Sequence, residues 1–143
     1  MKDDQNVRQS VSKAYAKAVT SGRAVSCCGE PVQKGVLAKF AGYDGETLST
    51  LPDSAVVNSF GCGNPLAYSE VKPSDVVLDL GSGAGIDILL AARTVGSTGH
   101  VIGIDMTDEM IAKAEKNITD SGLSNVEVCK GIIEDLPVET LSL

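Results

Sequence analysis

The feature that most constrains the fold is a glycine-rich turn set between two apolar segments. Residues 76–80 read Val-Val-Leu-Asp-Leu, which is typical of a strand buried on both faces. The sequence Gly-Ser-Gly-Ala-Gly at 81–85 interrupts this strand, and residues 86–95 continue as an apolar helix that Gly96 stops. This order predicts a strand, a tight turn and a helix in direct succession.

The glycines of the turn and one later acidic residue predict a ligand site. Gly81 permits the sharp turn, whereas Gly83 and Gly85 let a ligand and the helix approach the backbone closely. N–H groups at the start of the helix are then expected to meet a polar or anionic ligand group. Asp105 ends the next strand, where an acidic residue commonly accepts hydrogen bonds from a ribose diol. These features converge at the carboxyl edge of the sheet, where open α/β folds bind ligands.

The same alternation continues toward the C-terminal end of the sequence. Residues 100–105 and 125–130 are expected to form two further strands, separated by a helix. Thr107 is expected to cap this helix and Gly122 to end it. Such β-α-β-α-β alternation predicts an α/β fold with a parallel sheet and right-handed crossovers. The buried stripe of the helix is expected to comprise Met110, Ile111, Ala114 and Ile118.

The sequence before residue 72 is irregular and rich in Gly, Ser and Thr, so we divide the chain into a helical, cysteine-bearing region at 1–71 and a ligand-binding domain at 72–143. The clearest element of the first region is a helix over 7–19, where apolar residues recur at helical spacing. The other expected elements are a partly helical segment at 34–40, a turn at 44–46, a short helical segment at 47–51 that Pro52 ends, and a tight loop at 60–65.

The composition argues against several classes of partner. A net charge of −7 and an aromatic content of 3% disfavour binding to nucleic acid by phosphate contacts or base stacking. No apolar run approaches the roughly 20 residues of a membrane span, and the N-terminus carries no signal core, so we expect a cytoplasmic protein with no membrane partner. In that reducing compartment the cysteines are expected to be thiols. With His100 as the single histidine and no Cys-x-x-Cys pair, no metal site is expected.

The pattern around the turn distinguishes between two families of nucleoside-binding proteins. A dinucleotide fingerprint requires a third glycine at position 86, where this chain has Ile86. The acidic-x-Gly-x-Gly-x-Gly pattern at 79–85 instead resembles motif I of the class I S-adenosylmethionine-dependent methyltransferases. The resemblance implies that residues 72–143 form the N-terminal half of a Rossmann-like, S-adenosylmethionine-binding sheet.

The resemblance also implies a set of cofactor contacts. The amino-acid moiety lies over the glycine turn, the ribose meets Asp105, and adenine borders the segment after the third strand. Glu134 there is either an adenine contact or a plain solvated carboxylate, and Tyr15 either covers the cofactor or packs in the core. The cofactor-binding residues implied are Tyr15, Asp79, Gly81, Ser82, Gly83, Gly85, Asp105, Met106, Ile133 and Glu134.

Three segments together narrow the resemblance to the arsenite methyltransferases. They are Val-Leu-Asp-Leu-Gly-Ser-Gly-Ala-Gly at 77–85, Ile-Gly-Ile-Asp-Met-Thr at 102–107 and, most discriminating, Phe-Gly-Cys-Gly-Asn-Pro at 60–65. The family holds trivalent arsenic, as arsenite or its thiol conjugates, on cysteine thiolates, because a soft ligand suits a soft centre. The resemblance implies a thiol reductant of the thioredoxin or glutathione type. The matching thiol-binding or catalytic positions are Cys62 with Cys27 or Cys28, and the sequence does not choose between the last two.

The family pattern contains parts that this sequence does not match. The family has a fourth strand beside residues 76–80 and two further cysteines after it, so we expect a truncated chain that is inactive on its own. The strand at 76–80 is then an exposed edge, and we expect self-association through it. Cys129 matches no family motif and is expected to be a packing residue.

Other functions fit parts of the sequence. Another class I small-molecule methyltransferase shares the glycine turn. A nicotinamide-dependent oxidoreductase explains the turn and Asp105 but not Ile86. A non-enzymatic metalloid-binding module explains the thiols and leaves the turn unused.

Overall fold

A three-stranded parallel sheet forms the base of the molecule. The computed structural model describes residues 2–21, 24–25, 31–32, 36–60 and 63–137. The sheet has the order β3 (Val76–Leu80), β4 (His100–Asp105) and β5 (Val126–Lys130). All of its pairings are parallel, so the three carboxyl ends meet at one edge. The predicted α/β fold with three parallel strands and helices is confirmed.

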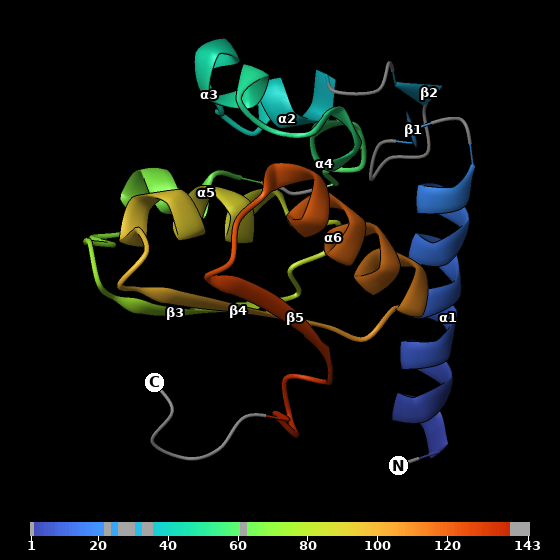
Figure 1. Ribbon diagram of the computed structural model, residues 1–143. Coiled ribbons are helices and arrows are strands. Elements are labelled where there is room, and N and C mark those ends of the chain that lie inside the picture. Colours follow the sequence, from blue (N-terminus) through green and yellow to red (C-terminus); the bar gives the residue numbers. More distant parts are fainter. Residues whose placement is uncertain (1, 22–23, 26–30, 33–35, 61–62, 138–143) are drawn as a thin grey trace.

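Two helices cover one face of this sheet. α5 (Ile86–Val95) connects β3 to β4, and α6 (Asp108–Ser121) connects β4 to β5 (Figure 1). Four valines of the strands, Val77, Val101, Val126 and Val128, pack with α5 in a core cluster. On the opposite face, which no helix of the described ranges covers in Figure 1, Val76 and Leu80 remain exposed.

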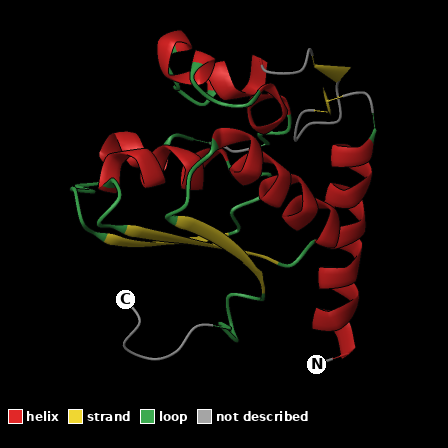
Figure 2. Cartoon of the chain, viewed as in Figure 1, coloured by secondary structure: helices red, strands yellow, loops and turns green. Residues whose placement is uncertain are grey.

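Short helices of the N-terminal region form a further layer above α5 and α6 (Figures 1 and 2). α1 stands beside α6, and α4 also contacts α6. The elements of this region are α1 (Lys2–Thr20), β1 (Ala24–Val25), β2 (Pro31–Val32), α2 (Val36–Phe40), α3 (Gly45–Ser49), α4 (Asp53–Val57) and the 3-10 helix η1 (Pro65–Tyr68). Within the described residues, no helix is both long enough and apolar enough to cross a bilayer.

A second apolar cluster attaches this layer to α5. Ile86 and Leu89 project from α5 into side chains of the short helices, and Leu89 is fully buried. Truncating a buried leucine of this kind costs about 2–5 kcal/mol of stability, so this contact fixes the position of the N-terminal layer. The partners from that layer are Ala38, Tyr43, Leu48, Leu51 and Ala55.

The helices of the N-terminal region differ from the sequence prediction in extent. The expected helix at 7–19 is present and longer, as α1. The prediction of a turn at 44–46 is wrong, because α3 already begins at Gly45. Asp44 caps this helix, and its side chain accepts a hydrogen bond from the Thr47 amide at 2.8 Å. Pro52 ends the preceding segment as expected and also directly precedes α4, which was not predicted. Proline suits the start of a helix, since the first amides have no helical acceptor.

The ends of α6 and β5 also differ in detail. Thr107 stands at the N-cap position and is buried, but its side chain makes no capping hydrogen bond, so the expected capping role is wrong. Gly122 ends the helix with a positive φ of 68°, as expected. Asn125 was expected to begin the third strand but lies outside β5. Its side-chain amide donates to the carbonyl oxygens of Ala92 and Gly96, at 2.8 Å each.

The buried stripe of α6 includes a polar residue that the apolar pattern did not reveal. Met110 and Ala114 are buried as expected, whereas Ile111 and Ile118 are only half-buried. Asn117 is fully buried, and its side-chain amide donates to the carbonyl oxygen of Ala84 at 2.9 Å. This hydrogen bond ties α6 directly to the glycine turn before α5.

Candidate functional site

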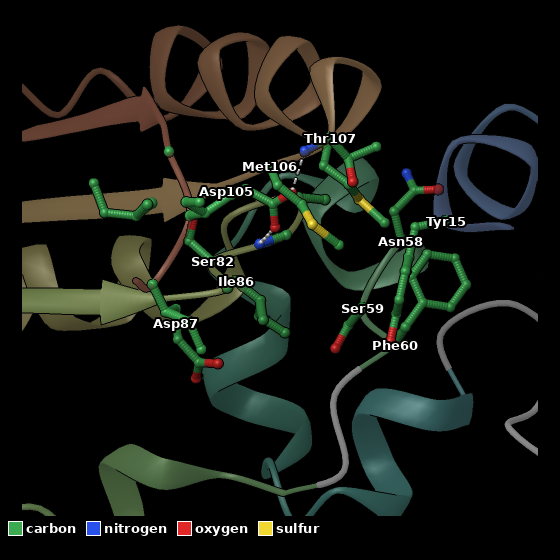
Figure 3. Close-up of a pocket in the computed structure, with 18 of the residues that line it drawn as sticks. Tyr15, Asn58, Ser59, Phe60, Ser82, Ile86, Asp87, Asp105, Met106 and Thr107 are labelled. Atoms are coloured by element: carbon green, nitrogen blue, oxygen red, sulfur yellow. Dashed lines mark hydrogen bonds between the residues drawn. The ribbon is translucent and has the colours of Figure 1, made fainter. Parts of the chain in front are cut away.

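A cavity of about 430 Å³ opens at the carboxyl edge of the sheet (Figure 3). One wall is the sheet edge with the glycine turn, and the other is formed by α1, α4 and the segment after α4. Its volume lies within the roughly 300–1,000 Å³ range of small-molecule pockets. The lining residues are Arg8, Tyr15, Ala55, Asn58, Ser59, Phe60, Gly81, Ser82, Gly83, Ala84, Ile86, Asp87, Ile104, Asp105, Met106, Thr107, Met110, Gly131, Ile132, Ile133 and Glu134.

The glycine turn is held against β4 by its own amides. The N–H groups of Gly81 and Ser82 both donate to the carbonyl oxygen of Ile104, at 2.7 and 3.0 Å. The N–H of Gly83 donates to a carboxylate oxygen of Asp105 at 3.0 Å. These amides are therefore engaged within the protein. The amides of the first turn of α5, at 86–88, have no helical acceptor and point toward the N-terminal end of the helix.

Asp105 joins three parts of the site. Its Oδ2 accepts from the Gly83 amide, and its Oδ1 accepts from the Thr107 amide at 2.8 Å. Figure 3 shows Asp105 at the cavity between the turn and the start of α6. Each carboxylate oxygen accepts about two hydrogen bonds, so a lone pair on each remains for a ligand. The fixed orientation suits a pair of adjacent hydroxyl donors.

Glycine is required in the turn and in the neighbouring strand for different reasons. Gly81 and Gly83 have φ values of +84° and +54°, which L side chains rarely adopt, and a Cβ on either would meet no atom within 4 Å. The open space at these positions allows a ligand to lie close to the backbone. Gly103 of β4 is instead closely covered, since an added Cβ would stand 2.8 Å from the Ser82 hydroxyl oxygen.

Two carboxylates lie buried at the end of β3 and the start of α5. Burial, followed by repulsion from Asp87 and Asp105, raises the pKa of Asp79 to about 6. Asp79 Oδ2 has no hydrogen-bond partner among the described residues. Burial also raises the pKa of Asp87, although a hydrogen bond from the Tyr43 hydroxyl opposes that increase. The site therefore holds concentrated negative potential, which favours a cationic ligand group.

The Tyr43 hydroxyl connects this acidic region with the N-terminal layer. It donates to Asp87 and also lies 3.4 Å from the carbonyl oxygen of Gly63. Burial and the neighbouring carboxylates raise the pKa of Tyr43, so it remains a donor at neutral pH. Gly63 is thereby held near the start of α5.

The second wall supplies aromatic and polar side chains. Tyr15 and Phe60 meet edge to face with ring centroids 6.3 Å apart (Figure 3). Arg8 of α1 pairs with Glu134, which follows β5, at 2.9 Å. Both side chains are well exposed, so the pair contributes only about 0–1 kcal/mol, but it joins the two walls across the cavity.

The structure brings most of the predicted cofactor-binding residues to this cavity. Eight of them line it, namely Tyr15, Gly81, Ser82, Gly83, Asp105, Met106, Ile133 and Glu134. Asp79, in β3, and Gly85, at the N-cap of α5, do not line the cavity. Cys27, Cys28 and Cys62 lie outside the described residues. Cys129 is half-buried in β5, on the sheet face opposite the helices.

Sequence reasoning missed the residues that the N-terminal layer contributes. Asn58, Ser59 and Phe60 line the cavity from the segment after α4, and Arg8 lines it from α1. None of these positions belongs to a glycine turn or a strand end. Of these residues only Phe60 belongs to a sequence motif, since it begins the Phe-Gly-Cys-Gly-Asn-Pro segment at 60–65.

Comparison with known proteins places the second half of the chain in a recognised group. Residues 71–142 match the model of a family described as "Methyltransferase domain". The chain is 40% identical, over an alignment of 150 residues, to an arsenite methyltransferase of Halobacterium salinarum, covering 96% of this chain and 38% of that protein. It is 33% identical over 141 residues to the human arsenite methyltransferase, covering 94% of this chain and 34% of that protein.

The chain thus spans well under half the length of these curated relatives. A solved structure of an arsenic(III) S-adenosylmethionine methyltransferase from Chlamydomonas reinhardtii has 32% identity and a TM-score of 0.48. That comparison covers 72% of this chain and 33% of the other.

We expect substitution of Asp79 by Asn to stabilise the chain at neutral pH. Because burial raises the folded-state pKa of Asp79 from 3.8 to about 6, ionisation of this carboxyl lowers stability as the pH rises between these two values, and the full cost is present above pH 7. Asp79→Asn removes the cost, so its free energy of unfolding should exceed that of the wild type by ~2 kcal/mol above pH 7. The difference should shrink as the pH falls toward 4.

Urea unfolding of both proteins across this pH range measures the difference. Asp135→Asn, at an exposed position, is the control and should leave the free energy of unfolding unchanged at every pH. An Asp79→Asn variant that is less stable than the wild type at pH 8 would contradict the account of a buried, unpartnered charge.

Proposed function

We propose, from the premise that this chain belongs to the methyltransferase domain family, that it binds S-adenosylmethionine and serves methyl transfer to thiol-bound trivalent arsenic. The observation that carries the proposal is the convergence of the glycine turn, Asp105 and the segment after β5 on one cavity. The names of the curated relatives support arsenite as the acceptor.

The residues of the cavity fit the proposed methyl donor. Open space over Gly81 and Gly83 admits a ligand against the backbone, and the free lone pairs of Asp105 suit a ribose diol. The buried, unpartnered Oδ2 of Asp79 is the proposed acceptor for the ammonium group of the donor. Backbone and side-chain groups at Ile133 and Glu134 are the proposed adenine contacts. When bound, S-adenosylmethionine supplies an electrophilic methyl group.

The chain's own residues then hold and shield the reacting groups. Tyr15 and Phe60 form an apolar cover over the cavity, and the Arg8–Glu134 pair closes one side of it. Exclusion of water by such a cover prevents competing hydrolysis and strengthens electrostatic contacts inside. Asp79 and Asp87 supply negative potential toward a cationic donor.

The proposed acceptor site uses the cysteines of the N-terminal region. Cys62, with Cys28 or Cys27, is the proposed thiolate pair for arsenite or its thiol conjugates, because thiolates prefer soft centres. Methylation raises the formal oxidation state of arsenic, so the proposal includes a thiol reductant of the thioredoxin or glutathione type. Thiolate ligands require a reducing compartment, which supports a cytoplasmic location.

The edge of β3 supports a proposal about assembly. β3 pairs only with β4 among the described strands, and its Val76 and Leu80 side chains are exposed. An unpaired, apolar edge strand is a template for pairing with another chain. We propose that the chain self-associates through this edge.

The cofactor proposal predicts a specific ligand preference. Calorimetric titration should show micromolar binding of S-adenosylhomocysteine to the wild-type chain and no comparable binding of NADH. Asp105→Asn should weaken the binding of S-adenosylhomocysteine by roughly tenfold or more, since it replaces a charge-assisted acceptor. Asp120→Asn, in an exposed ion pair with Lys116, is the control and should bind as the wild type does. Equal binding of NADH, or no binding of S-adenosylhomocysteine, would refute the proposal.

The acceptor proposal predicts which thiols matter. Arsenite titration of the reduced chain should show tight binding that Cys62→Ser abolishes. Of Cys27→Ser and Cys28→Ser, the one that also loses binding identifies the second ligand. Cys129→Ser is the matched control and should retain binding, because Cys129 lies in β5 away from the cavity lining. Retention of arsenite binding by Cys62→Ser would overturn the proposed ligand set.

The proposed self-association through β3 predicts that positive charges on this strand will reduce the mass of the assembly. Sedimentation at tens of micromolar should show the wild-type chain as a dimer or larger species, and the double variant Val76→Lys with Leu80→Lys as a monomer. Val7→Lys replaces an exposed valine on α1 and should leave the assembly intact. A monomeric wild-type chain would contradict self-association.

A further inference from the structure

A buried serine hydroxyl faces the cavity without a partner. Ser59 follows α4 and is only 6% exposed. Its Oγ has no hydrogen-bond partner among the described residues, although the residue lines the cavity. An unsatisfied buried hydroxyl costs about 1–3 kcal/mol, so its presence at a ligand cavity points to a hydrogen bond with the ligand.

The position of Ser59 indicates which end of a ligand it would meet. In Figure 3 Ser59 lies beside Asn58 and Phe60, across the cavity from Ile86 and Asp87, and its hydroxyl is directed into the space between the two walls. Asp105 and Met106 lie at a different part of the cavity, toward the start of α6. Ser59 therefore faces the start of α5 across the cavity, and the proposed function puts the amino-acid portion of the methyl donor between them.

The charges at this end distinguish the two groups of an amino acid. Asp79 and Asp87 are carboxylates, so they favour an ammonium group and repel another carboxylate. The ligand's carboxylate thus needs neutral donors away from them. The amides of Gly81, Ser82 and Gly83 already donate within the protein. Of the lining side chains described, only Ser59 and Ser82 have buried hydroxyls without a partner.

The two hydroxyls are not equivalent. Ser82 Oγ lies against β4, 2.8 Å from where a Cβ on Gly103 would stand, and so belongs to the wall beneath the turn. Ser59 comes from the opposite wall. A ligand lying over the turn would thus have Ser59 on its outer side, where the carboxylate can point away from the buried acidic groups.

We propose that Ser59 is a specificity-determining residue that donates a hydrogen bond to the carboxylate of the amino-acid portion of the methyl donor. The inference rests on the proposed function and assigns a role to a residue outside the glycine turn. It explains why a serine is buried at the end of α4, where an apolar residue would otherwise pack at lower cost.

The test compares two donors that differ only in this carboxylate. Affinities of S-adenosylmethionine and decarboxylated S-adenosylmethionine are measured by calorimetry for the wild type, Ser59→Ala and Ser59→Thr. Ser59→Ala should weaken the binding of S-adenosylmethionine about tenfold and that of the decarboxylated compound less than twofold. Ser59→Thr retains the hydroxyl and should keep most of the wild-type preference between the two donors.

Ser54→Ala provides a matched control. Ser54 also has a buried hydroxyl without a partner among the described residues and lies on α4, but it does not line the cavity. Its replacement should change neither affinity. Equal weakening of both donors by Ser59→Ala would assign Ser59 a structural role and overturn the inference, as would no weakening of either. A wild-type chain that binds neither donor would instead refute the proposed function.

Discussion

The site depends on the hydrogen bonds that fasten the glycine turn to β4. Ile104 accepts from two consecutive amides of the turn, and Asp105 accepts from a third. Because β3 and β4 are parallel and adjacent, the turn after one strand lies beside the end of the other, and these bonds hold it there. The turn can then keep the positive φ values of Gly81 and Gly83, which leave room over the backbone. Without these hydrogen bonds, the glycine turn would not be held in place as one wall of the cavity.

The second wall of the cavity comes from a part of the chain distant in sequence. Ile86 and Leu89 of α5 pack into the short N-terminal helices, and Tyr43 of that layer donates to Asp87. The same helix thus begins at the glycine turn and carries the N-terminal layer on its outer side. The two walls meet because α5 packs against the short helices and α6 contacts α1 and α4. These contacts explain how residues before 61 reach the cavity beside the turn at 81–85.

The sequence supported prediction of the regular, periodic part of the fold and of the first wall. β3, α5 and β4 have the predicted bounds, and Asp105 lies at the cavity as expected, because strand alternation and parallel topology are local patterns. Asn117 and Ser59 could not be predicted, since their burial depends on contacts between distant segments. The start of α3 was missed because a capping Asp followed by Gly also resembles a turn. The predicted thiol positions at 27, 28 and 62 remain predictions.

The most direct test of the central claim is an NMR titration of the isotope-labelled chain with S-adenosylhomocysteine. The account predicts saturable amide shifts concentrated in the turn at 81–85, at 105–107, at 131–134 and at 58–60, which together surround the cavity. Such a pattern would locate the ligand between the two walls. Saturable shifts confined to other surfaces, or no shifts at millimolar ligand in a folded sample, would contradict the claim that the turn and Asp105 form a nucleoside-binding site.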